Sequence, residues 1–301
     1  MSNPLLVLVG ATASGKSAVA VPLAERLGAE ILSMDSMLVY RGMEIGTDKP
    51  PAAERARVPH HLIDLLDPWQ PFDLRRYLRA ADAAVAEVQG RGRRVLVAGG
   101  TGLYLMGLCK GVFESPPVDP ELRARLEALP TAELRARVEQ IDPELWERVH
   151  PNDHRRLRRA AEVYEQTGTP LSELQRQFQG PDRYPAVFCG IRRSRPDLHA
   201  RIRTRVDAMF AGGLVDEVRG LELGPTAAQA VGYKEVRAAL DGEHDLDQAR
   251  ALVVRHTVRL VRRQSAWFKR FPIRWVDAAP GEGPEQIVPR LLEIYAGKTA
   301  Q

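Results

Sequence analysis

A glycine-rich stretch near the N-terminus has the spacing of a phosphate-binding loop. Residues 10–17 read GATASGKS, match the pattern G-x-x-x-x-G-K-S/T and follow directly after the apolar run Pro4–Val9. In such a loop, backbone N–H groups surround an anion, the next helix adds its positive N-terminal end, and the lysine neutralises phosphate oxygens. We predict that a diphosphate or triphosphate binds to Gly10, Ala11, Thr12, Ala13, Ser14, Gly15, Lys16 and Ser17. The Ser17 hydroxyl would ligate Mg²⁺.

The phosphate-binding pattern does not by itself imply nucleotide hydrolysis. Nucleotide hydrolases usually carry an aspartate at the end of an apolar strand, where it helps to hold Mg²⁺. The best strand of this kind, Arg94–Ala98, runs into Gly99–Gly102 without an acidic residue. The sequence therefore argues against a motor or switch NTPase.

Two polar residues outside the loop follow predicted strands. Asp35 comes after Glu30–Ser33, and Thr101 comes after Arg94–Ala98. Ligands of open α/β sheets bind at the carboxyl ends of the strands, so both residues should lie near the phosphate. Asp35 could deprotonate a nucleophile, and the Thr101 hydroxyl could orient the phosphate or the nucleophile. Either residue could instead cap a helix or stabilise a turn.

The alternation of apolar runs with helical stretches predicts an α/β fold. The expected strands have continuous apolar runs, as strands buried on both faces do, and they cover 4–9, Glu30–Ser33, Arg94–Ala98, Ala186–Ile191 and Ile273–Val276. Helical patterns cover Phe72–Gln89, Arg195–Phe210, Val215–Leu221 and Asp247–Phe268. This order predicts a P-loop NTPase-like parallel sheet flanked by helices.

The middle of the chain has no strand signal from about Asp119 to Gln179. Helical patterns instead cover Pro120–Leu129, Ala132–Ile141, Pro143–Val149 and Asp153–Gln166. We therefore expect an all-helical insertion domain at 116–184 that contacts the partner, inserted into a catalytic α/β core formed by 1–115 and 185–301.

Arginines gather on two of the predicted helices. One group lies within little more than one turn of the inserted block and consists of Arg155, Arg156, Arg158 and Arg159. A second stripe runs along the helix Asp247–Phe268 and its end, with Arg255, Arg259, Arg262, Arg263, Lys269 and Arg270. Guanidinium groups match phosphate oxygens in a bidentate way, so the two groups together favour a nucleic acid. For either group alone, a solvated helix face is an equally good interpretation.

The overall composition is that of an ordinary globular protein. The 301 residues include 43 basic and 39 acidic side chains, for a net charge of +4, and no apolar run has the length of a membrane span. The N-terminal segment lacks the features of a signal peptide, and the two distant cysteines, Cys109 and Cys189, suit a reducing compartment. We expect a cytoplasmic protein with no membrane partner, no obligate protein partner and no histidine-based metal site.

Together, the motifs resemble one family, the tRNA dimethylallyltransferases, also called tRNA isopentenyltransferases. Besides residues 10–17, the matching segments are Met34–Tyr40, Gly46–Pro50, Val58–Leu62, Gly99–Tyr104, Pro151–Asp153 with Arg156, Val231–Glu235 and Arg263–Phe268. The phosphate-binding loop is shared by many families, whereas its combination with Asp35-Ser36, Gly46–Pro50 and Gly99–Tyr104 is far more specific. The resemblance is to the bacterial members, because no Cys/His zinc finger follows these segments.

The resemblance implies transfer of a dimethylallyl group from dimethylallyl diphosphate to N6 of the adenosine 3′ of the anticodon (position 37) in tRNA, with release of diphosphate. The loop would then hold the diphosphate, and Lys16 and Mg²⁺ bound by Ser17 would stabilise it as the allylic C–O bond breaks. Asp35 would accept a proton from the N6 amine, with Thr101 orienting Asp35 or the diphosphate. Arg205 is expected as a further diphosphate contact.

The resemblance also implies which residues contact the anticodon stem-loop. The target base must leave its stack to reach the site, as in other base-modifying enzymes. The expected tRNA contacts are Asp35, Ser36, Met37, Leu38, Thr101, Arg123, Arg155, Arg156, Leu157, Arg158 and Arg159. The family commonly has Gln in place of Arg155 and Pro in place of His154, and both changes keep or add polarity.

Three other functions stay open. A small-molecule P-loop kinase shares the loop and the acid, but it explains neither the insertion nor the arginines. An isopentenyltransferase that acts on free adenylate has the same chemistry, although the insertion favours tRNA. A non-enzymatic RNA-binding protein with a relic loop is disfavoured by the intact Lys16, Ser17 and Asp35.

Overall fold

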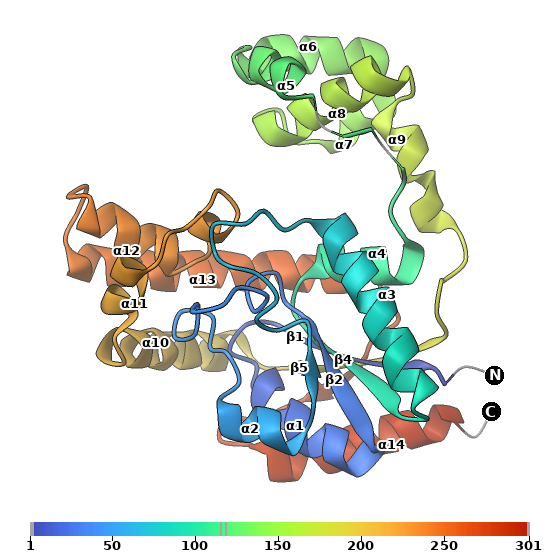
Figure 1. Cartoon of the computed structure of the whole chain (residues 1–301), viewed down its shortest axis with the longest axis vertical. Coiled ribbons are helices and arrows are strands. Elements are labelled where there is room, and N and C mark those ends of the chain that lie inside the picture. Colours follow the sequence, from blue (N-terminus) through green and yellow to red (C-terminus); the bar gives the residue numbers. More distant parts are fainter. Residues whose placement is uncertain (1–2, 115, 118, 300–301) are drawn as a thin grey trace. The chain divides into compact units, whose positions relative to one another are not determined.

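Six parallel strands form the sheet at the centre of the larger of two structural units (Figure 1). In the computed structural model, which describes residues 3–114, 116–117 and 119–299, their order is β3-β2-β4-β1-β5-β6. The strands are β1 (Leu5–Gly10), β2 (Ala29–Met34), β3 (His60–His61), β4 (Arg94–Gly99), β5 (Ala186–Arg192) and β6 (Arg274–Asp277). All neighbouring strands pair in parallel, so the predicted P-loop NTPase-like fold class is confirmed.

The central strands are buried on both faces, as their continuous apolar runs predict. All residues of β1 and β2 are buried. Leu8 of β1 pairs with Ala98 of β4 on one side and with Cys189 of β5 on the other. The five predicted strands are therefore confirmed. Strand β3 is absent from the prediction, because two histidines give no apolar signal.

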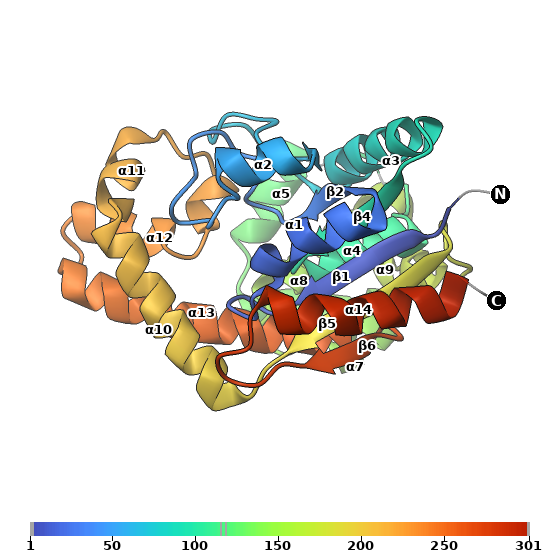
Figure 2. The ribbon, with the colours of Figure 1, turned by 90° about the horizontal axis from the view of Figure 1, so that it is seen from below.

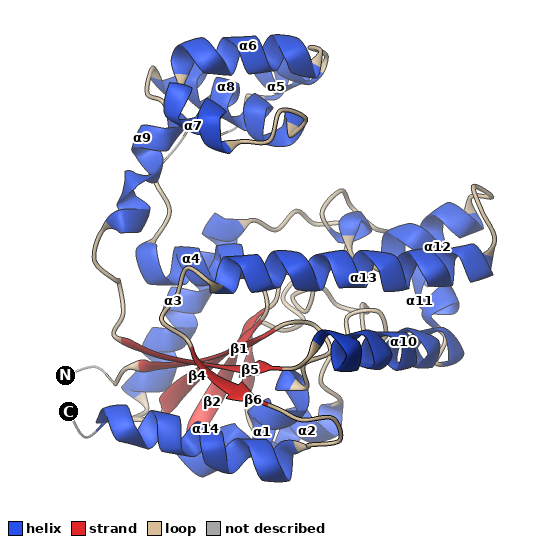
Figure 3. Cartoon of the chain, turned by 180° about the vertical axis from the view of Figure 1, so that it is seen from behind, coloured by secondary structure: helices blue, strands red, loops and turns tan. Residues whose placement is uncertain are grey.

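Helices cover both faces of the sheet (Figure 3). On one face lie α1 (Lys16–Leu27) and α14 (Pro284–Thr299), which can be followed in Figure 2, and their side chains share one core cluster with the strands. On the other face lie α3 (Leu74–Gly90), α4 (Gly102–Lys110) and α13 (Leu246–Phe268). Tyr77 of α3 stacks on Tyr104 of α4 with 4.1 Å between ring centroids.

A further group of helices lies around the phosphate-binding loop, and two of them, α10 and α13, pack against it. It includes α10 (Arg195–Ala211), α11 (Leu214–Gly220) and α12 (Tyr233–Leu240), together with α13. Ile202 of α10 and Val253 of α13 belong to one apolar cluster, against which Ala11 and Ala13 of the loop pack. The prediction contains α3, α10, α11 and α13 but lacks α12, α14, α4 and the short α2 (Ala52–Arg57).

The smaller unit, Cys109–Arg183, is helical in all the regular elements that the structure describes. It contains α5 (Pro120–Glu127), α6 (Thr131–Ile141), α7 (Pro143–Arg148), α8 (His154–Thr167), α9 (Leu171–Leu174) and the 3-10 turn η1 (Gln175–Gln179). The first four are the predicted helices, whereas α9 and η1 are new. The larger unit is Met1–Leu108 with Tyr184–Gln301, so the division falls at other residues than the expected 116–184.

Local signals explain where the helices of the smaller unit begin and end. Asp119, Asp142 and Asp153 precede α5, α7 and α8, and each side chain accepts a hydrogen bond from an N–H group of the first turn. Helix α8 ends at Gly168, whose φ of 69° is left-handed.

No helix among the described residues combines the length and apolar character needed to cross a membrane.

Candidate active site

A pocket of about 980 Å³ opens where β1, β2 and β4 end. Its lining includes all of residues 10–17, together with Asp35 and Leu38, which follow β2. Further polar lining residues come from the segment 44–51 and from helices α10 and α13, and they include Glu44, Asp48, Lys49, Arg201, Arg205 and Gln264. Ser33 of β2 and His60 of β3 also line the pocket. The sheet thus brings the predicted loop, acid and arginine to one place.

Residues 10–17 have the backbone of an anion-binding loop. Ala13 and Gly15 have positive φ angles of 67° and 93°. A Cβ atom at Gly10 would lie 2.5 Å from Oγ of Ser14, so a larger residue there would displace the Ser14 side chain. Gly15 caps α1 without a side-chain hydrogen bond, so the first N–H groups of α1 are available to an anion in the pocket.

Three side chains that the sequence analysis missed hold this loop by hydrogen bonds to its backbone. Arg193 donates from Nε to the carbonyl oxygen of Ser14 at 2.8 Å. Arg201 donates from Nε to the carbonyl oxygen of Ala13 at 2.7 Å. Gln264 accepts a hydrogen bond from the Thr12 N–H at 2.9 Å. Because C=O and N–H point in opposite directions across a trans peptide bond, the bond to Ser14 turns the N–H of the next residue into the loop.

Lys16 is surrounded by both signs of charge. Burial lowers the pKa of its ammonium group, attraction to Asp35 and Asp48 opposes this, and repulsion from Arg205 adds to it, so that the pKa lies below its usual 10.5. A diphosphate in the pocket would favour the protonated lysine.

Asp35 stands at the pocket directly after β2. Its Oδ1 accepts a hydrogen bond from the Met37 N–H at 2.8 Å. Asp35 therefore stabilises a turn, which is the alternative role that the sequence analysis gave for it. Its Oδ2 makes no hydrogen bond within the described part of the chain. Of the neighbours expected to contact RNA, Leu38 lines the pocket, whereas Ser36 and Met37 are not among the lining residues.

Thr101 is held beside the same strand end by its backbone. Its N–H donates to the carbonyl oxygen of Met34 at 3.2 Å. Its carbonyl oxygen accepts from the N–H groups of Tyr104 and Leu105, at the start of α4. Thr101 itself is not among the residues that line the pocket. Thr101 therefore lies at the start of a helix, which is the alternative that the sequence analysis gave for this residue.

The segment 44–51 forms a wall of the pocket, and α11 holds it in place. The carboxylate of Glu217 accepts hydrogen bonds of 2.8–3.2 Å from three consecutive N–H groups, those of Glu44, Ile45 and Gly46. The Tyr233 hydroxyl donates to the same carboxylate at 2.5 Å. A Cβ atom at Gly46 would lie 2.4 Å from the Tyr233 ring, so this segment approaches α12 as only glycine allows.

Two charged side chains of this segment are paired. Lys49 has a fully buried side chain, and its Nζ donates to the Tyr40 carbonyl oxygen at 2.7 Å and to Oδ1 of Asp64 at 2.5 Å. Asp48 pairs with Arg205 of α10 at 3.1 Å. Arg205 therefore lies in the pocket, as expected, with a carboxylate beside it.

The pocket suits a Mg²⁺ ion that a substrate shares. Ser17 and Asp35 both line it, whereas no cluster of three or more His, Cys, Asp or Glu residues with metal-binding geometry occurs in the described chain. Mg²⁺ usually keeps several waters and takes one or two protein oxygens together with substrate phosphates. The donors present therefore fit a Mg²⁺ ion held by one or two protein oxygens, not an all-protein cage.

The predicted RNA-contacting arginines of the smaller unit are mostly engaged in ion pairs. Arg156 pairs with Asp153 at 3.3 Å, while Arg158 pairs with Glu127 and Glu162. Arg123 and Arg159 also contact Glu162. Arg155 is exposed, and no ion pair involves it in the part of the chain that is described. The basic face is thus less positive than the sequence predicts.

Leu157 corrects one expectation. Its side chain is fully buried in the core of the smaller unit, beside Leu134 and Val138. The prediction that this side chain contacts RNA is therefore wrong. The sequence analysis grouped Leu157 with the arginines on both sides of it. Consecutive residues of a helix point in different directions, however, so Leu157 faces the core while its neighbours face outward.

The second arginine stripe is exposed and unpaired. Helix α13 buries Val253, Val261 and Gln264 on one face. The exposed positions include Arg255, Arg259, Arg262 and Arg263, none of which forms an ion pair with a described residue. Helix α13 therefore presents more uncompensated positive charge than α8.

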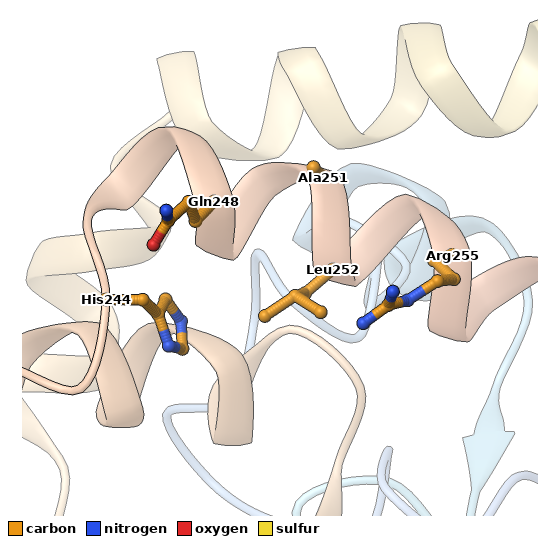
Figure 4. Close-up of a pocket in the computed structure, with 5 residues that line it drawn as sticks. All are labelled: His244, Gln248, Ala251, Leu252 and Arg255. Carbon is orange, nitrogen blue, oxygen red and sulfur yellow. The ribbon is translucent and has the colours of Figure 1, made fainter.

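A second depression, of about 410 Å³, lies at the start of α13 (Figure 4). It is lined by His244, Gln248, Ala251, Leu252 and Arg255, and Figure 4 shows His244 opposite Leu252 and Arg255. The His244 Nε2 lies 3.1 Å from the carbonyl oxygen of Glu235. Among the described residues that line this depression, none is a carboxylate and none belongs to the phosphate-binding loop, in contrast to the larger pocket.

The fold and pocket define an α/β protein of the P-loop type, with an anion-binding loop, a neighbouring carboxylate and a helical insertion. The sequence pattern of the family described as "IPP transferase" matches residues 38–271, and that of "Isopentenyl transferase" matches residues 3–61. The chain belongs to the IPP transferase family, and it is an enzyme of the prenyltransferase class.

Named relatives extend over nearly the whole chain. Identity is 47% over 282 residues to tRNA dimethylallyltransferase 1 of Citrifermentans bemidjiense, covering 91% of this chain and 92% of that protein. It is 46% over 284 residues to tRNA dimethylallyltransferase of Geobacter sulfurreducens, covering 91% of both chains.

Solved structures agree with these relatives. The full-length tRNA isopentenylpyrophosphate transferase from Bacillus halodurans gives a TM-score of 0.72 at 35% identity, over 97% of this chain and 96% of that one. A eukaryotic dimethylallyltransferase acting on tRNA gives a TM-score of 0.79 at 26% identity, over 92% of this chain and 74% of that one.

Proposed function

We propose that the protein is a tRNA dimethylallyltransferase. It transfers the dimethylallyl group of dimethylallyl diphosphate to N6 of the adenosine 3′ of the anticodon (position 37) in tRNA and releases diphosphate. The observation that carries the proposal is that the anion-binding loop, Lys16 and the carboxylate of Asp35 line the same pocket. The relatives named for this reaction, at 47% and 46% identity, support it.

The loop and its cations would bind the leaving group. Breaking the allylic C–O bond transfers negative charge to the diphosphate, and N–H groups and cations fixed in advance stabilise charge where it develops. The N-terminal end of α1, Lys16 and Arg205 would face this charge. Ser17 would hold Mg²⁺, which would supply further positive charge to the phosphate oxygens.

Asp35 would serve as the general base. The exocyclic amine of adenine is a poor nucleophile, so removal of its proton as nitrogen attacks carbon lowers the barrier. The hydrogen bond from Met37 fixes Oδ1 and leaves Oδ2 to accept the N6 proton. Thr101, fixed beside the end of β2, would orient Asp35 or the diphosphate.

The RNA partner would be the anticodon stem-loop with the target base turned out of its stack. Asp35, Ser36, Met37, Leu38 and Thr101 would contact the base and its neighbours. Arg123, Arg155, Arg156, Arg158 and Arg159 would contact the backbone from the smaller unit. A tRNA substrate and two buried free cysteines also suit the cytoplasm.

The acceptor separates this proposal from a free-adenylate prenyltransferase. The experiment measures transfer of labelled dimethylallyl from its diphosphate to bulk unmodified tRNA and, in parallel, to AMP, with and without Mg²⁺. We expect Mg²⁺-dependent label in tRNA and none in AMP. Label in AMP would make the protein an adenylate enzyme. No label in either acceptor, together with ATP-dependent phosphorylation of a small alcohol, would make it a kinase.

A further inference from the structure

We propose that Glu162 is a positioning residue that arranges three arginines of the smaller unit into one phosphate-binding surface for RNA. This inference rests on the proposed function, because it concerns how the same RNA substrate is held. Glu162 would not touch the RNA. It would act through Arg123, Arg158 and Arg159.

The geometry around Glu162 is that of a shared anchor. Arg123 of α5 forms a bidentate pair with it, with 2.8 Å between Nε and Oε1 and 3.0 Å between NH2 and Oε2. From α8 itself, Nε of Arg158 lies 3.3 Å from Oε1, and NH1 of Arg159 lies 3.4 Å from Oε2. One carboxylate thus connects guanidinium groups from two helices.

Burial makes this anchor rigid while its partners still reach the surface. The side chain of Glu162 is 1% exposed, whereas those of Arg123, Arg159 and Arg158 are 43%, 31% and 17% exposed. Burial raises the pKa of Glu162, but the hydrogen bonds and charges of the arginines outweigh it and lower the pKa below its usual value. The carboxylate is therefore ionised at neutral pH. The pair with Arg123 uses Nε and NH2 and leaves NH1 to bind a phosphate.

The positioning role makes a prediction opposite in sign to simple electrostatics. A carboxylate in a basic surface repels phosphate, so its neutralisation should strengthen RNA binding if only net charge mattered. If Glu162 instead holds the arginines in place, its loss removes the carboxylate that gathers them, and Arg123 and Arg159 spread apart while Arg158 keeps its pair with Glu127. Ordering them again on RNA then lowers affinity.

Helix α8 also supplies a matched control. Glu165 lies three residues after Glu162, pairs with Arg125 at 3.0 Å and Arg137 at 2.8 Å, and is 21% exposed. Neither of those arginines belongs to the predicted RNA-contacting set. Glu165→Gln therefore makes the same charge change as Glu162→Gln on the same helix without disturbing the proposed surface.

The experiment uses the full chain and an unmodified anticodon stem-loop RNA. For Glu162→Gln we expect the Kd and the KM for RNA to rise about fivefold to tenfold, with kcat and the KM for dimethylallyl diphosphate unchanged. The dependence of log Kd on log salt should become shallower, by about one phosphate contact. Glu165→Gln should bind RNA as well as the wild type or better.

A second variant keeps the test decisive if Glu162→Gln does not fold. Arg123→Lys retains the charge but cannot form the bidentate pair, and it should weaken RNA binding in the same direction. Unchanged or tighter binding by the folded Glu162→Gln protein would overturn the inference, as would an equal loss with Glu165→Gln. If Glu162→Gln does not fold, unchanged binding by Arg123→Lys would overturn it. A wild type that neither binds nor modifies the RNA would overturn the proposed function itself.

Discussion

Nε of Arg193 donates to the carbonyl oxygen of Ser14 at 2.8 Å, across 179 residues of sequence. The same guanidinium group donates to Asp197 at 3.1 Å and to the carbonyl oxygens of Ala279 and Glu282 at 2.8 and 2.6 Å. Its side chain is 1% exposed. One buried cation therefore connects the phosphate-binding loop with α10 and with the segment before α14.

Arg193→Met should destabilise the protein and loosen the loop. It leaves Asp197 and three carbonyl oxygens without their donor, a loss that typically costs about 3 kcal/mol of unfolding free energy. The KM for dimethylallyl diphosphate should also rise, about tenfold, because the Ser14 peptide is no longer held. Urea unfolding and steady-state kinetics measure both effects. The control is Arg192→Met, since that side chain is 57% exposed in its pair with Asp277 and should cost less than about 1 kcal/mol. Equal losses in the two variants would contradict the role of Arg193.

Asp35→Asn should abolish most turnover and leave RNA binding intact. The amide keeps the size of the carboxylate but cannot accept the N6 proton, so kcat should fall by a factor of about 10²–10⁴. Single-turnover transfer and RNA binding by fluorescence anisotropy measure the two properties separately. A variant with full turnover would show that another group is the base.

Glu217→Gln should change the wall of the pocket formed by residues 44–51. The amide retains one oxygen acceptor, so it cannot satisfy the three N–H groups and the Tyr233 hydroxyl that the carboxylate now accepts, and about 1–3 kcal/mol of stability should be lost. The KM for dimethylallyl diphosphate should rise several-fold. Asp216→Asn is the neighbouring control, with a 79% exposed side chain, and should leave both properties unchanged. An unaltered KM in Glu217→Gln would show that this wall does not shape the substrate site.

Glu30 should make stability depend on pH in the acidic range. This buried carboxylate of β2 accepts from Nε2 of His61 at 2.7 Å and from NH2 of Arg91 at 2.8 Å. Burial raises its pKa, but these two partners outweigh burial and lower the pKa below 4.5. A carboxylate with a lowered folded-state pKa stabilises the fold above its unfolded-state pKa. This contribution is lost as pH falls through the folded-state pKa.

The variant Glu30→Gln tests this dependence. It should be less stable than the wild type at neutral pH, by about 1–3 kcal/mol, and the difference should shrink as the pH falls below about 4. Urea unfolding across this pH range gives the difference directly. A constant difference at all pH values would show that the ionised carboxylate contributes no stability.

Much of the larger unit follows from local sequence signals. The apolar runs of β1, β2, β4 and β5 predict buried parallel strands. Phosphate binding by residues 10–17 can also be predicted, because the loop binds an anion with its own backbone and the helix that follows it. The strand order places Asp35 beside that loop, since parallel strands share one carboxyl edge. The four longer helices of the smaller unit, α5 to α8, carry their own caps. The short β3 and α9 were missed because they have too few residues for a periodic pattern.

Local sequence patterns are enough to predict the phosphate-binding loop, the parallel sheet, the base candidate Asp35 and the helical insertion. The distant side chains that hold the loop, among them Arg193 and Gln264, are identified by the three-dimensional packing alone. It also shows that Glu162 gathers arginines that look like an open basic face, and that Leu157 turns inward. Local patterns come from hydrogen bonds and turns between near neighbours. An ion pair or a buried contact depends instead on which distant residues packing brings together.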